Sequence, residues 1–149
     1  MINTPNLELA KKLIKIEKEP VIVRAQNSEF NRKILEYGKF NILLSPEIGE
    51  KHDGLKQLES GLNHVLAKIA AKNNIAIGID FDVIKKLDKK EKAIRLARIR
   101  QNIFICRKAE TKIVLVNFKD KRNAFSFLVS LGASTQQAEE AIKHENKER

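Results

Sequence analysis

Six carboxylate or imidazole side chains lie in polar segments that follow apolar runs, where they could act together on a metal ion. They are Glu47, His52, Asp53, Asp80, Asp82 and Asp120. Zinc sites take three or four such ligands, and this chain lacks the His-x-His and His-Glu-x-x-His spacings. We therefore expect most of these carboxylates to cap helices and turns. A metal-dependent phosphoesterase with Asp80, Asp82 and His52 as ligands stays open as an alternative.

The sequence offers no nucleophile motif and no phosphate-binding loop. Cys106, the single cysteine, lies in an apolar stretch, there is no Gly-x-Ser-x-Gly motif, and the six glycines fit neither the dinucleotide nor the P-loop spacing. Signatures of the common RNA-binding modules are also missing, and the aromatic residues are seven Phe and one Tyr. This composition favours contact of Lys and Arg with an RNA backbone over stacking of bases on aromatic rings.

The positive charge of the chain is concentrated in one segment. The net charge is +10, from 29 Lys plus Arg against 19 Asp plus Glu. Residues 84–123 hold fourteen of the basic and four of the acidic side chains, so they carry the whole excess, while the flanks nearly cancel. A solvated helix face is the ordinary explanation for scattered lysines. Such a concentration indicates instead a surface that faces a polyanion.

Four short apolar runs predict strands that would position these residues. They are Pro20–Arg24, Phe40–Leu44, Ile75–Ile79 and Lys112–Val116. The runs are rich in Val and Ile and barely alternate, which is typical of strands covered on both faces of a parallel sheet. Helical stretches lie between them. We therefore predict repeated βαβ units, with functional residues in the loops at the carboxyl ends of the strands.

Helix signals flank these runs. Asn6–Lys18 has an amphipathic repeat, and Ser60 is the predicted N-cap of a helix that runs to Asn73 and Asn74. Ser134–Gln137 matches a capping box at the start of the last helix, before a polar tail at residues 144–149. The apolar face expected for the helix after Ser60 consists of Leu62, Val65, Leu66, Ile69 and Ala70.

The segment Glu91–Lys108 carries two apolar stripes. The first is Leu96, Ile99, Ile103 and Cys106, and the second is Ile94, Ala97, Phe104 and Ile105. One stripe can pack on the sheet, so the other needs a neighbouring helix or a partner. A protein-binding scaffold is therefore a further hypothesis.

The length and composition suit a single domain, residues 1–149. The chain has 149 residues, 42% of them hydrophobic, and no repeat or linker divides it. A single cysteine is typical of a reducing compartment, and no apolar run approaches the ~18 residues of a membrane-spanning helix. We expect a cytoplasmic protein that does not enter the membrane.

Three sequence blocks resemble archaeal ribonuclease P protein component 3. They are I-L-L-S-P-E-I-G at 42–49, the more specific G-L-N-H-V-L-A-K-I-A at 61–70, and R-L-A-R-I-R-Q-N-I at 95–103, with Cys106, Arg107 and Lys108 after it. Asn31-Arg32 and Ile75–Ile77 also fit, so the resemblance covers about residues 31–108. It implies an α/β fold of parallel βα units, an incomplete TIM-barrel-like domain related to the polymerase-and-histidinol-phosphatase barrel.

The resemblance also implies a function. In that family the RNA subunit removes the 5′ leader of precursor tRNA, and the protein is a non-catalytic subunit that supports it. The implied partners are ribonuclease P RNA, protein component 2 and other ribonuclease P proteins, with precursor tRNA contacted indirectly. No cofactor is expected on the protein, and Mg²⁺ is expected in the RNA. The loop between Gly49 and Gly61 and the segment Asn117–Arg122 depart from the family pattern.

The residues expected to contact RNA combine the basic segment with one face of the helix before it. They are His64, Lys68, Lys85, Lys86, Lys89, Lys90, Arg95, Arg98, Arg100, Asn102 and Arg107. Arg suits bidentate phosphate contact and Lys a point-charge contact. For His64 and Lys68 the alternative is a plain solvent-facing surface.

Overall fold

The computed structural model describes residues 1–49, 51, 53 and 58–143. In chain order the elements are α1 (Leu7–Ile16), β1 (Ile22–Arg24), α2 (Ser28–Tyr37), β2 (Ile42–Leu44), α3 (His64–Lys72), β3 (Ala76–Asp80), α4 (Phe81–Lys85), α5 (Lys89–Ala109), β4 (Ile113–Val116), α6 (Lys121–Ser130) and α7 (Thr135–Ala141). The polar tail at 144–149 lies outside the described residues. Within the part of the chain that the structure describes, no helix combines the length and apolar character needed to cross a bilayer.

The strands form one parallel sheet with the order β1-β2-β3-β4. All four predicted strands are confirmed, with bounds shifted by one or two residues. Each strand pairs with the next one along the chain, and helices connect them, which is the winding of an α/β barrel segment. The predicted fold class, parallel βα units in a partial TIM-barrel-like arrangement, is therefore confirmed.

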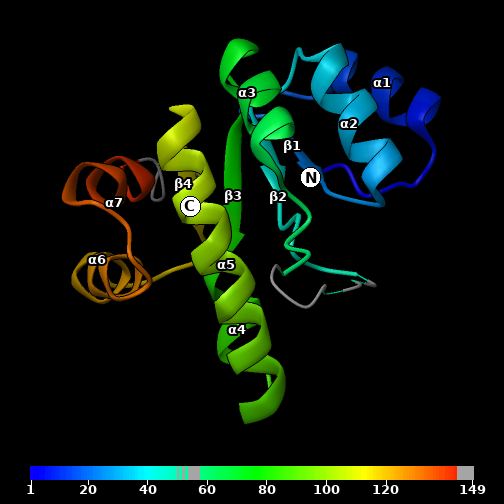
Figure 1. Ribbon diagram of the computed structural model, residues 1–149. Coiled ribbons are helices and arrows are strands. Elements are labelled where there is room, and N and C mark those ends of the chain that lie inside the picture. Colours follow the sequence, from blue (N-terminus) through cyan, green and yellow to red (C-terminus); the bar gives the residue numbers. More distant parts are fainter. Residues whose placement is uncertain (50, 52, 54–57, 144–149) are drawn as a thin grey trace.

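The sheet packs its core against helices on one face. Val23, Leu43, Ile77 and Ile113 stand at one register level, and each is at most 3% exposed. α3 and α5 lie in front of the strands, α1 and α2 on the β1 side, and α6 and α7 on the β4 side (Figure 1). Of the two apolar stripes of α5, the first is the one that packs here: Ile99, Ile103 and Cys106 are at most 1% exposed, and Leu96 is partly buried.

The outer edge of β1 is met by the start of the chain. The N–H of Ile2 donates to the carbonyl of Ile22, and the N–H of Arg24 donates to the carbonyl of Ile2, both at 2.8 Å. Ile2 is 2% exposed and forms a parallel bridge with Val23. The backbone of Ile2 thus covers part of this edge.

Two predictions about α3 are wrong. The helix starts three residues later than expected, because Asn63, and not Ser60, accepts the capping hydrogen bond, from the N–H of Leu66 at 2.9 Å. With this start Val65 turns toward solvent and is 57% exposed, while Leu66 and Ala70 are buried.

The capping box at Ser134 is confirmed, since its hydroxyl accepts from the N–H of Gln137 and the Gln137 side chain accepts from the N–H of Ser134.

Candidate nucleic-acid interface

The solvent-facing side of α5 is basic. Burial of Ile99, Ile103 and Cys106 against the sheet turns the opposite side of the helix outward. The exposed cations of that helix, which we call the basic face, are Lys89, Lys90, Arg100, Arg107 and Lys108. Glu91, in the first turn, is the exposed acidic residue of the same helix. A surface with this balance suits a polyanion, because its field is opposed by little negative charge of its own.

Arg95 and Arg98 are partly buried and turned toward the chain itself. Arg98 places Nη2 3.2 Å from Oδ2 of Asp53, and its side chain is 15% exposed. Arg95 is half-buried, and its Nη1 has no hydrogen-bond partner among the described residues. Arg98 is therefore bound to the loop that follows β2, and both arginines are less accessible than the exposed cations of the basic face.

The remaining predicted cations differ in whether another group of the chain binds them. Lys86 and Lys85 form ion pairs with the carboxylate of Asp82, at 2.8 Å and 4.0 Å. The hydrogen bond from Lys86 lowers the pKa of Asp82. Arg107 stays exposed while its Nη1 donates to the carbonyl of Gly132 at 2.7 Å. Two further predicted residues, His64 and Lys68, are exposed on α3.

Asn102 has an internal role. It is 3% exposed, and its Nδ2 donates to the carbonyl of Ser60 at 3.1 Å. The neighbouring Gln101 donates to the carbonyl of Leu58 at 2.8 Å and to the hydroxyl of Ser60 at 3.1 Å. The structure thus places Asn102 beneath the surface, where with Gln101 it holds the segment before α3 against α5. Its expected contact with RNA is not supported by this position.

Gly61 allows that segment to pass close to the loop after β2. Its φ is +79°, and a Cβ atom there would overlap the carbonyl oxygen of Pro46. Both the left-handed backbone and the close approach require glycine at this position. The G-L-N-H-V block therefore combines a backbone contact at Gly61 with the cap at Asn63.

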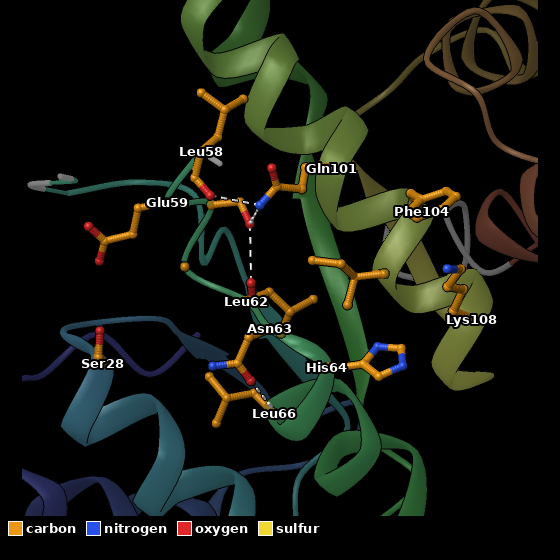
Figure 2. A pocket seen from close by; sticks show the side chains of 13 residues that line it. Ser28, Leu58, Glu59, Leu62, Asn63, His64, Leu66, Gln101, Phe104 and Lys108 are labelled. Carbon is orange, nitrogen blue, oxygen red and sulfur yellow. Dashed lines mark hydrogen bonds between the residues drawn. The ribbon is translucent and has the colours of Figure 1, made fainter. Parts of the chain in front are cut away.

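A groove of about 670 Å³ lies between the start of α3 and the C-terminal half of α5. Its walls include Leu62 and His64 on one side and Gln101, Phe104 and Lys108 on the other. In Figure 2, His64, Phe104 and Lys108 lie together at one end, and Glu59 lies at the other. Phe104 is 48% exposed, and Nζ of Lys108 lies 4.8 Å from its ring centroid. Part of the second apolar stripe of α5 thus lines an open groove, with Lys108 at the same end as Phe104 and Glu59 at the other.

Glu47 is a buried carboxyl group in the loop that follows β2. It is 2% exposed, and this burial raises its pKa from 4.5 to about 7. The positive charges of Arg95, Lys51 and Arg24 act in the opposite direction and offset the burial only in part. Glu47 is therefore a group that changes charge near neutral pH, at the carboxyl-end side of the sheet.

The other acidic candidates have structural roles. Asp80 caps α4 by accepting from the N–H of Val83 at 3.3 Å, and Asp120 caps α6 by accepting from the N–H of Arg122 at 2.8 Å. The expectation that such carboxylates cap helices is confirmed for these two. Among the described residues no three His, Cys, Asp or Glu side chains gather as metal ligands do. His52 lies outside those residues.

The chain is similar in sequence and fold to archaeal ribonuclease P proteins. Ribonuclease P protein component 3 of Methanococcus maripaludis is 26% identical over 113 residues, 76% of this chain. The Methanocaldococcus jannaschii and Methanosarcina mazei proteins of the same name are 28% and 32% identical over 95 residues, 64% of this chain. A chain in the cryo-EM structure of archaeal ribonuclease P with mature tRNA superposes with a TM-score of 0.77 and 25% identity over 94% of this chain. No protein-family model matches the chain.

The chain is a relative of archaeal ribonuclease P protein component 3. The resemblance drawn from residues 31–108 is thus confirmed, and it favours the ribonuclease P hypothesis over a metal-dependent phosphoesterase. The chain spans about half the length or less of these curated relatives: the matched part is 46% of the Methanococcus maripaludis protein, 38% of the Methanocaldococcus jannaschii protein and 36% of the Methanosarcina mazei protein. It covers 62% of the chain in the cryo-EM structure.

Three residues of this component 3 relative were missed as site candidates. Lys108 belongs to the basic face, Phe104 is exposed between cations, and Gln101 holds a groove wall. Lys108 was one of the counted charges of the basic segment, and Phe104 was part of the second apolar stripe. Phe104 lies in the second apolar stripe and also within the basic segment 84–123, and this combination was the signal that could have marked it as a site candidate.

Proposed function

We propose that the chain is a non-catalytic protein subunit of ribonuclease P, which binds the catalytic RNA and supports removal of the 5′ leader from precursor tRNA. The observation that supports this most is the basic face of α5, in a chain similar to component 3. Lys and Arg on a rigid helix neutralise phosphates without reading base identity. Precursor tRNA is contacted indirectly, through the RNA.

The proposal includes partners and a place of action. Protein component 2 and other ribonuclease P proteins assemble with the chain on the RNA, and the Mg²⁺ ions used in cleavage are held by the RNA. The cytoplasm is the proposed compartment. There a free thiol stays reduced, and burial raises the pKa of Cys106 to about 12, which keeps it protonated.

Binding to ribonuclease P RNA tests this function. The purified chain should bind the RNA with an affinity that falls steeply with salt, and addition of the chain to the RNA and the other protein subunits should raise the rate of leader removal. Metal-dependent cleavage of precursor tRNA by the chain without any RNA subunit would contradict the proposal and restore the phosphoesterase alternative.

A further inference from the structure

Phe104 is the aromatic side chain that this chain leaves exposed. All seven Phe and the Tyr lie in the described part, and the other seven aromatic residues are buried or half-buried. Phe104 is 48% exposed, on the groove between α3 and α5. Single exposed apolar residues are common on protein surfaces, so exposure alone indicates no site. The surroundings of this ring are what set it apart.

Two cations lie over the Phe104 ring. Nζ of Lys108 lies 4.8 Å and Cζ of Arg107 lies 5.7 Å from the ring centroid. His64 faces the same end of the groove from α3, as Figure 2 shows. An occupant of this end therefore meets a flat apolar surface with positive charge directly beside it.

We propose that this groove holds one unpaired nucleotide of ribonuclease P RNA, with its base stacked on Phe104 and its phosphate beside Lys108. The inference rests on the proposed function and adds a single stacked base to the backbone contacts of the basic face. The groove, about 670 Å³, lies within the usual size range for small-ligand pockets. Bases within a duplex have both faces covered, so the occupant is a nucleotide from a loop, bulge or end.

A nucleotide matches both properties of the groove, whereas an apolar protein segment matches one. Such a segment would cover the Phe104 ring but would desolvate Lys108 without pairing it, which is costly. A nucleotide supplies a π face for the ring and an anion for the cations.

Gln101 and Asn63, two polar residues that line the groove, are engaged with the chain itself. The amide nitrogen of Gln101 donates to the carbonyl of Leu58 and the hydroxyl of Ser60, and the side-chain oxygen of Asn63 caps α3. These contacts hold the groove walls. Stacking tolerates every base, so a weak sequence preference follows.

Substitution of Phe104 separates stacking from charge. Loss of one stacked base lowers affinity by about 5- to 150-fold. Phe104→Leu should therefore weaken binding to ribonuclease P RNA by such a factor at every salt concentration, with the slope of log affinity against log salt unchanged. Phe104→Tyr keeps the ring and should bind like wild type. Ile94→Ala, at another exposed apolar position of α5, is the matched control and should also bind like wild type.

Ultraviolet crosslinking of the wild-type chain needs no variant and should join Phe104 to a nucleotide that is unpaired in the RNA. If wild type does not bind the RNA, the proposed function fails. If wild type binds, but Phe104→Leu binds equally well and no crosslink forms at Phe104, the stacking inference is overturned while the function stands. If Phe104→Leu keeps RNA affinity and loses association with protein component 2, the groove is a protein site and the inference is again overturned.

Discussion

Neutralising exposed cations of α5 should change how RNA binding responds to salt. In the triple variant Lys89→Gln, Lys90→Gln and Arg100→Gln, three charges of the basic face are lost. Each phosphate contact contributes about 0.7 to 0.9 to the slope of log affinity against log salt. The triple variant should therefore flatten that slope by about two to three units. Glutamine is a good helix former, so α5 should remain folded.

The choice of residues follows from burial. Arg98 is paired with Asp53 and its side chain is 15% exposed, so its substitution would mix a loss of stability with a loss of RNA contact. A matched control removes the same charge elsewhere, with Lys12, Lys15 and Lys18 changed to Gln, since all three are exposed at or after α1. Titration of binding to ribonuclease P RNA over a range of KCl concentrations, with thermal melts, compares the two. A control variant that flattens the slope as much as the α5 variant would refute the basic face as the RNA surface.

Three further perturbations test the interior. The pKa of Glu47 is about 7 in the folded chain and 4.5 in the unfolded chain, so the free energy of unfolding of wild type should fall by about 3 kcal/mol as pH rises from 4.5 through 7. Urea unfolding of Glu47→Gln, measured over the same pH range, should lack this loss. Asn102→Ala should lower the unfolding free energy by about 1–3 kcal/mol, because the buried carbonyl of Ser60 loses its donor, and the salt slope of the folded variant should match wild type. Gly61→Ala should cost about 1–3 kcal/mol more in denaturant unfolding than Gly132→Ala, since both have positive φ but only the first meets a backbone carbonyl; equal costs would contradict the close approach.

The strands and the start of α7 were predictable because their signals are local. Continuous Val and Ile runs read as buried parallel strands, and the pairing of Ser134 with Gln137 depends on residues three apart. Ser60 does not cap α3, because its hydroxyl is buried and donates to the carbonyl of Leu62, which sequence spacing does not reveal.

The sequence predicted where the positive charge of the candidate interface lies, but not which side chains are exposed there. The excess of cations in residues 84–123 pointed to the segment that contains α5. The packing of Ile99 and Ile103, which only the structure shows, decides that Arg100 faces solvent while Arg98 turns toward Asp53. Asn102 shares a helix with these cations, and its position three residues after Ile99 and four before Cys106 was the available signal that it lies beside the buried stripe.

The most direct test of the account is the rate of 5′-leader removal from precursor tRNA by ribonuclease P RNA assembled with the other protein subunits, measured with and without this chain. Added wild-type chain should raise the rate. The triple variant of α5 should need a higher concentration to give the same rate, and that difference should widen at lower salt. A rate that is unaffected by the chain, although the chain is folded and present in excess, would contradict its assignment as a ribonuclease P subunit.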